Sequence, residues 1–146
     1  MTQSNITALQ SVLNYISDSR DGYNKAAETV DRTGFKTVFA ARAQERAAMA
    51  ARLEANIRAA GAAPDTDGTL LGAAHRGFMD VAAVFQNNEK AAVELIDDGE
   101  ERLREKVDET LESGDLTGQD RIMLEGIKRE LAADCRIIER MEDSVD

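Results

Sequence analysis

The sequence predicts an all-α fold, a four-helix bundle in one domain over residues 1–146. Residues with high helix propensity are abundant, above all Ala, Leu, Glu and Arg, and the chain contains one Pro. No segment alternates between apolar and polar residues for long enough to indicate a sheet. Apolar residues instead recur every three or four positions over long stretches, which is the period of an amphipathic helix. A chain of 146 residues suits a single core.

Two helices are expected in the first part of the chain. The first begins at Ser4 or Asn5, either of which can cap it, and continues to about residue 30. A tight connection over residues 31–34 leads to the second helix at about residues 35–60. Gly61 follows directly, and glycine after the last helical residue is a common terminator.

Two further long helices are expected in the second part. Pro64 interrupts the loop at residues 61–68, and a short apolar helix follows at about residues 69–85. The third long helix covers about residues 89–113, where Gly114 ends it, and the last covers about residues 117–142.

The long connection between the second and third helices determines the predicted topology. A helix of about 25 residues is about 37 Å long, and the segment at residues 61–88 is long enough to recross the bundle. The other two connections are short. This combination predicts a ferritin-like arrangement, with one long crossover that carries a short extra helix.

The apolar stripes are interrupted by charges near their middle, at Arg20, Glu100 and Asp134. The stripes are Leu9, Leu13, Ile16, Arg20, Tyr23, Ala27 and Val30; Val93, Ile96, Glu100, Leu103, Val107 and Leu111; and Leu124, Ile127, Leu131, Asp134, Ile138, Met141 and Val145. The second helix adds Glu45 in a less regular stripe that also contains Arg42. A buried charge is costly unless it is paired or binds a metal.

The positions of these charges along the helices predict that they meet. Arg20 and Glu45 lie about equally far from the first short connection, and Glu100 and Asp134 lie at comparable distances from the second. With the crossover, both pairs fall near the middle of the bundle. Because arginine keeps its proton and donates to carboxylates, we expect a central ionic cluster of Arg20, Glu45, Glu100 and Asp134.

Two other interpretations stay open. Arg20 can extend its stem along the core and reach solvent. Alternatively, the layer binds iron or another divalent metal, as in ferritin-like proteins that use Glu and Glu-x-x-His ligands. The candidate ligands are Asp21, Glu45, Glu100 and Asp134, with Asp97 in reserve. No histidine follows these carboxylates at the required spacing, and the single histidine, His75, lies in the expected crossover helix.

Composition argues against several classes of partner. The formal net charge is -10, and an acidic surface repels nucleic acid and anionic membranes. The chain has neither a span of apolar residues long enough for a bilayer nor a secretory signal at its start, so we expect a cytoplasmic protein. One cysteine, Cys135, excludes an internal disulfide.

Four segments resemble a bacterial family of ferritin-like four-helix-bundle proteins of unknown function, and more distantly the Yci-type stress proteins. They are DGYNKAAE, FAARAQERAAMAARL, GTLLGAAHRGFMDV and DDGEERLREKVDETLE. The resemblance implies a ferritin-like fold and little established chemistry. It also implies an acidic residue at about the position of Arg20 and a histidine at about the position of Asp134, and this chain has lost both.

The leading functional hypothesis is a non-catalytic, stress-related helical bundle without a cofactor, whose degenerate metal site is replaced by the ionic cluster. The alternative is a divalent-metal or di-iron carboxylate protein that binds or oxidises iron. A third hypothesis is a dimerising adaptor, because Ala47, Ala48, Ala50 and Ala51 allow close helix approach. A homo-oligomer is therefore one expectation for the partners, and an enzyme is the less favoured one.

Overall fold

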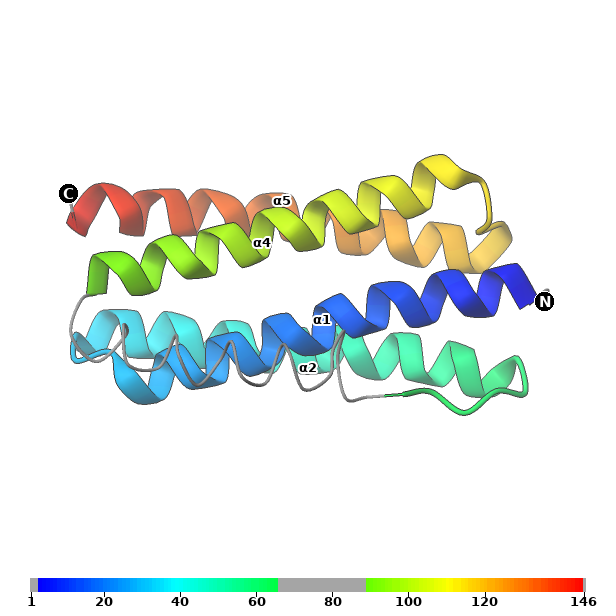
Figure 1. Cartoon of the computed structure of the whole chain (residues 1–146), viewed down its shortest axis with the longest axis horizontal. Helices are drawn as coiled ribbons and strands as arrows, with labels where there is room; N and C mark the ends of the chain where they lie inside the picture. The colour runs from blue at the N-terminus through cyan, green and yellow to red at the C-terminus, as the bar shows by residue number, and fades with distance from the viewer. Residues whose placement is uncertain (1–2, 66–88, 146) are drawn as a thin grey trace.

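The computed structural model describes residues 3–65 and 89–145, and the only regular secondary structure in this part of the chain is α-helix (Figure 1). It contains four long helices: α1 (Gln3–Thr29), α2 (Thr33–Ala59), α4 (Glu89–Ser113) and α5 (Gly118–Val145). Each predicted long helix is present, with ends within a few residues of those expected. The predicted short helix at residues 69–85, and His75 in it, lie outside the described residues.

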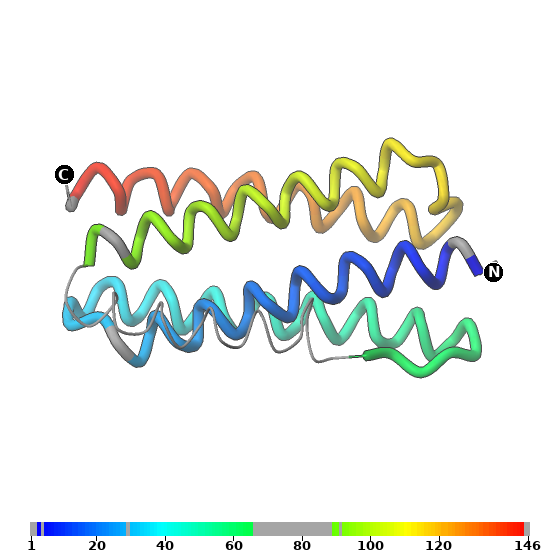
Figure 2. The backbone as a smooth tube through the Cα atoms, viewed as in Figure 1, coloured from blue at the N-terminus to red at the C-terminus, as the bar shows by residue number. Residues whose placement is uncertain are grey.

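The helices form a bundle of two antiparallel hairpins, α1–α2 and α4–α5 (Figure 1). Figure 2 shows that α2 and α4 run in the same direction, because α2 ends at one end of the bundle and α4 begins at the other. In the view of Figure 1, α1 and α4 lie in front of α2 and α5. No helix in the described part combines the length and apolarity needed to cross a bilayer.

Glycine and backbone hydrogen bonds explain where α2 ends. Gly61 has a φ of 89°, which side chains rarely adopt, and its N–H donates to the carbonyl of Arg58 at 2.9 Å. The N–H of Ala62 reaches the carbonyl of Ile57 at 3.1 Å. These bonds satisfy carbonyls that the helix itself leaves without partners.

Two polar contacts fasten the ends of the described segments to the bundle. Gln10 on α1 donates to the carbonyl of Asp65 at 2.8 Å and accepts from its N–H at 2.9 Å. At the opposite end, the carboxylate of Glu89 accepts from the backbone N–H of Arg32 at 2.8 Å and pairs with its Nε at 3.3 Å. Asp65 and Glu89, the last and first described residues on either side of residues 66–88, are therefore both held against the bundle.

The core consists of two apolar clusters. One is built around Leu9, Leu13, Leu53, Leu124 and Ile127. The other is built around Tyr23, Phe39, Val93, Ile96 and Ile138. The first half of α1 and the second half of α2 contribute to the first cluster, and the remaining halves contribute to the second. Buried charged residues lie between the two clusters, at the middle of the bundle.

Candidate functional site

The middle layer of the bundle contains four buried charged side chains. Arg42 and Arg46 come from α2, Glu100 from α4 and Asp134 from α5, and each is less than 8% exposed. Glu45 of α2 borders the layer with 30% of its side chain exposed. We call these five residues the ionic layer. Ser19 on α1 also reaches it, so all four helices contribute to one site.

Arg46 is the centre of the ionic layer and is fully buried. Its Nη2 donates to both carboxylate oxygens of Glu100 at 2.9 Å, and hydrogen bonds between two charged groups are stronger than neutral ones. Its Nη1 donates to Asp134 at 3.0 Å and to Glu45 at 3.4 Å. Its Nε donates to the hydroxyl of Ser19 at 3.2 Å. Every nitrogen of the guanidinium therefore has a partner.

Arg42 joins two of the same carboxylates one turn earlier along α2. Its Nη1 donates to Glu45 at 2.6 Å and to Asp134 at 2.5 Å. Asp134 thus accepts from both arginines, one at each oxygen. The i, i+4 spacing of Arg42 and Arg46 puts both side chains on one face of α2, because a helix repeats every 3.6 residues.

The charges of the ionic layer shift one another's pKa values. Burial lowers the pKa of Arg46, but Glu100, Tyr23 and Asp134 together outweigh this effect and the pKa is raised. Burial and a hydrogen bond shared with Glu45 raise the pKa of Asp134 from 3.8 to about 6, against the effect of Arg46. The pKa of Glu45 is lowered: burial opposes this, but the hydrogen bonds with Asp134 and Arg42 prevail.

Three carboxyl groups face two guanidinium groups, so one proton shared by Glu45 and Asp134 brings the layer to zero net charge. The raised pKa of Asp134 places that proton there in mildly acidic solution. Tyr23 lies beside the layer, with its ring 5.6 Å from the Arg46 guanidinium carbon. Burial and the charge of Glu100 raise the pKa of Tyr23, so its hydroxyl stays protonated.

The structure places the three predicted carboxylates Glu45, Glu100 and Asp134 in this one layer. It places Arg20 elsewhere, and this corrects the predicted cluster. The Nε of Arg20 donates to Asp21 at 3.0 Å, with the two side chains 25% and 46% exposed. A 3–4 repeat after Ile16 permits position 19 or position 20 on the inner face, and Ser19 occupies it. Asp21 therefore stands at the edge of the bundle.

Sequence reasoning missed Arg42 and Arg46 as the cations. The signal was available, because the buried positions of α2 follow a regular 3–4 repeat: Phe35, Phe39, Arg42, Arg46, Met49, Leu53 and Ile57. Both arginines occupy buried positions of this repeat, at the height of Glu100 and Asp134, where apolar residues would be expected. Of the remaining candidates, Asp97 is partly buried beside Cys135.

Cys135 follows Asp134 on α5 but belongs to a different environment. Its sulfur accepts from Arg104 at 3.1 Å and its thiol donates to Glu139 at 3.6 Å. Burial raises the pKa of the thiol, and the charge of Arg104 opposes this only in part. A thiol with a raised pKa is a poor nucleophile, so Cys135 does not add reactive chemistry to the ionic layer.

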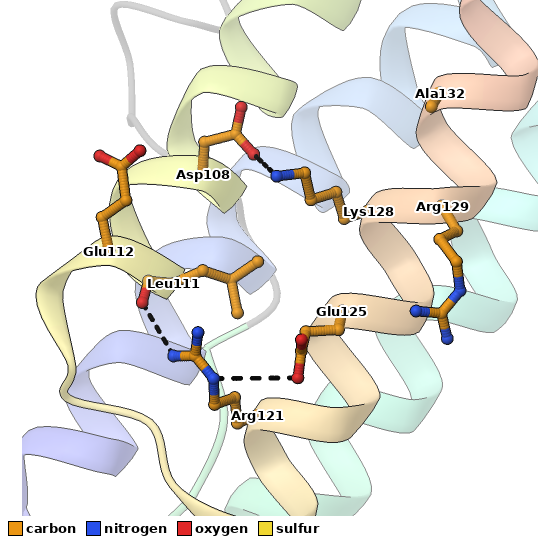
Figure 3. Close-up of a pocket in the computed structure, with 8 residues that line it drawn as sticks. All are labelled: Asp108, Leu111, Glu112, Arg121, Glu125, Lys128, Arg129 and Ala132. Carbon is orange, nitrogen blue, oxygen red and sulfur yellow. Dashed lines mark hydrogen bonds and ion pairs between the residues drawn. The ribbon is translucent and has the colours of Figure 1, made fainter.

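A surface pocket of about 390 Å³ lies between α4 and α5, away from the ionic layer (Figure 3). Its lining residues are Asp108, Leu111, Glu112, Arg121, Glu125, Lys128, Arg129 and Ala132. Lys128 pairs with Asp108 at 2.9 Å, and Arg121 donates to the carbonyl of Leu111 at 2.9 Å. Arg129 points away from the other side chains (Figure 3). Cations and carboxylates in the pocket are equal in number, so its charge favours no class of ligand.

Comparison with known proteins identifies a family. The chain belongs to the family described as a domain of unknown function (DUF2383), whose model matches residues 4–113. The match covers α1, α2 and α4, and with them Arg42, Glu45, Arg46 and Glu100, while Asp134 lies beyond it. No curated protein and no solved structure matched the chain. The comparisons returned no relationship to ferritin-like or Yci-type proteins.

Proposed function

We propose that this DUF2383 member is a non-catalytic, ferritin-like helical bundle in which an arginine–carboxylate layer takes the place of a metal centre. It acts through its folded surface, in the cytoplasm and in a stress-related role of the kind that the resemblance to Yci-type proteins implies. Its ionic layer is structural: it holds four helices together at one height. The protein performs no turnover at this site.

The connectivity of the helices supports the ferritin-like part of this proposal. Two antiparallel hairpins whose second and third long helices run parallel need one long crossover, and this is the arrangement of ferritin-like bundles. The direction of α2 and α4 in Figure 2 meets this requirement. The ionic layer also lies at the middle of the bundle, where ferritin-like proteins hold their metal ions.

The observation that carries the proposal is the pairing of Arg46 with Glu100. The guanidinium has no exposed surface, Glu100 is 1% exposed, and both carboxylate oxygens accept from one nitrogen at 2.9 Å. Arginine remains protonated and does not bind metals. It therefore provides, as a fixed side chain, the positive charge that a metal ion provides in a carboxylate site.

The residues present do not fit a di-metal centre. Metal ions of this kind need free carboxylate lone pairs and, in ferritin-like proteins, imidazole ligands. Here the oxygens of Glu100 and Asp134 already accept from guanidinium groups at 2.5–3.0 Å. A divalent ion among them would also lie within a few ångströms of two arginine charges, which repel it. The position on α1 that faces the layer is Ser19 and not a carboxylate.

Metal content tests this proposal directly. The protein is loaded with excess ferrous iron, manganese or zinc, desalted and measured by elemental mass spectrometry, and oxygen consumption is followed with ferrous iron. We expect no stoichiometric metal and no ferroxidase turnover. The Glu112→Ala variant, which removes an exposed carboxylate of α4 far from the layer, serves as the control for weak surface binding.

One or two ions per chain, lost in Glu100→Ala and retained in Glu112→Ala, would overturn the proposal. That result would establish the iron-binding alternative, and the arginines would then have to move away from the carboxylates when metal binds. Metal that is lost equally in both variants belongs to the acidic surface, and leaves the ionic layer as a structural element.

A further inference from the structure

Two isoleucines on α5 point to solvent. Ile122 is 59% exposed and Ile137 is 37% exposed, and no other large hydrophobic side chain in the described residues is exposed. They are separated by four turns, or about 22 Å, and face within about 60° of each other. Gly126 and the exposed Ala133 lie between them on the same face, four residues in from each end. The outer face of α5 therefore has a large apolar side chain at each end, with Gly126, Ala133 and the exposed Arg129 between them.

The adjoining face of α2 is lined by small residues. Ala41, Ala48 and Ala55 are all exposed and follow one another at intervals of seven residues, which keeps them on one side of the helix. This side adjoins α5, because Arg52 of α2 pairs with Glu130 of α5 at 3.0 Å. The two helices thus form one continuous surface, which we call the α2–α5 face.

Two hydrogen bonds between the helices fix which residues lie at the same height. Arg42 bonds to Asp134, and Asn56 bonds to Asp120 at 2.8 Å. Because α2 and α5 are antiparallel, one step back along α2 corresponds to one step forward along α5. Ala41 therefore lies level with Cys135, within about 3 Å in height of Ile137, and Ala55 lies within about 2 Å in height of Ile122.

We propose that the α2–α5 face is the interface of a homodimer whose two-fold axis is parallel to the helices. Rotation about such an axis places α5 of one copy over α2 of the other and keeps every height unchanged. Ile137 and Ile122 of each copy then pack on Ala41 and Ala55 of the other. Large side chains meet small ones at both ends, and each contact occurs twice.

Electrostatic repulsion favours a two-fold axis parallel to the helices over one perpendicular to them. A two-fold axis perpendicular to the helices would place α5 on α5, and the exposed Arg129, Arg136 and Arg140 of the two copies would repel each other. With the parallel axis, Arg129 and Arg136 approach α2 of the second copy on either side of the height of Glu45. The carboxylate of Glu45 is 30% exposed on this face and can accept a further hydrogen bond.

The area of the face is also that of a dimer interface. Two adjacent helices about 40 Å long and about 10 Å across present about 800 Å². One partner contributes about this area to a standard protein–protein interface. The copies carry a net charge of -10 each, which opposes association, so salt should strengthen the dimer by screening that repulsion.

Sedimentation velocity on the full chain, from micromolar to millimolar protein, tests the proposal. We expect a dimer that tightens as salt is added. Ile137→Glu and Ala48→Glu should each raise the dimer dissociation constant at least about 30-fold, because each change is made twice in a symmetric interface. Ala47→Glu is the matched control: Ala47 is exposed on the same helix, turned about 100° away from Ala48, and the change in charge is identical.

Disulfide cross-linking tests the predicted register. Ala41→Cys and Ile137→Cys are made separately, each with Cys135→Ala, and are mixed and oxidised. Only the mixture should give a covalent dimer in high yield, because the axis places position 41 of one copy against position 137 of the other. A monomer at millimolar protein and high salt, a dimer that tolerates Ala48→Glu as well as Ala47→Glu, or equal cross-linking of each variant alone would overturn the proposal.

Discussion

Replacing Arg46 with methionine removes the central cation and keeps a side chain of similar length. Arg46 is fully buried and donates twice to Glu100, which is 1% exposed. In the variant, Glu100 retains the hydroxyl of Ser19 at 3.3 Å, and Asp134 retains Arg42. Removing one partner of a buried ion pair costs about 3–5 kcal/mol. We expect the free energy of unfolding at pH 7 to fall by about 4 kcal/mol.

The loss in Arg46→Met should depend on pH. Without its cation, the buried carboxylate of Glu100 is more stable when it is protonated. The folded variant then binds more protons than its unfolded chain. The loss in free energy of unfolding relative to the wild type is therefore largest at neutral pH and becomes smaller as the solution is acidified. Arg46→Met/Glu100→Gln removes the stranded charge and should recover part of the stability at pH 7.

Urea unfolding followed by circular dichroism at pH 7 and pH 4.5 measures these differences. Arg52→Met is the control on the same helix, because Arg52 is 45% exposed in its pair with Glu130. It should change the free energy of unfolding by less than about 1 kcal/mol. The reasoning is refuted if Arg46→Met is no more destabilising than Arg52→Met, or if its deficit is equal at the two pH values.

Three further outcomes are expected. Asp134→Asn should remove one pH-dependent contribution to the free energy of unfolding. The pKa of Asp134 is raised from 3.8 to about 6 in the folded protein, so the stability of the wild type relative to the variant is greatest below pH 3.8 and falls as the pH rises through 6. Urea titrations across this range measure this difference, and a difference that rises with pH would contradict the prediction. Arg20→Leu should cost less than about 1 kcal/mol, because Arg20 pairs with Asp21 at a partly exposed edge, and a loss as large as that of Arg46→Met would return Arg20 to the central cluster. Gly61→Ala should lower stability by about 1 kcal/mol, because the φ of 89° is strained for alanine; calorimetry measures it, and an unchanged melting temperature would argue against that backbone conformation.

The sequence was sufficient to predict the four long helices and the height of the carboxylates. Turn residues mark the helix ends, and the carboxylates were placed by counting residues from the two short connections. Glu100 and Asp134 could be assigned to the core because α4 and α5 have clean apolar stripes on otherwise charged helices. The homodimer and the absence of a metal site stay predictions.

The cations could not be assigned with the same certainty, for a physical reason. On α2 the inner face carries Arg42 and Arg46, whereas the outer face carries many alanines, so polarity hardly distinguishes the two faces. On α1, a 3–4 repeat admits Ser19 or Arg20 at the inner position, and the difference of 100° between them decides which one meets the layer. Only the packing of α2 against its neighbours resolved both choices.

The origin of the charges in the ionic layer has a consequence for assembly. Both arginines come from the hairpin α1–α2, whereas Glu100 and Asp134 come from the hairpin α4–α5. Two copies of the first hairpin would bring four arginines together with only the two Glu45 carboxylates, and two copies of the second would bring four carboxyl groups together without an arginine, so each hairpin pairs favourably with the other. A slip of one helical turn would move the arginines by about 5.4 Å and leave these charges without partners. The ionic layer therefore favours the pairing of one hairpin with the other and a single register between them.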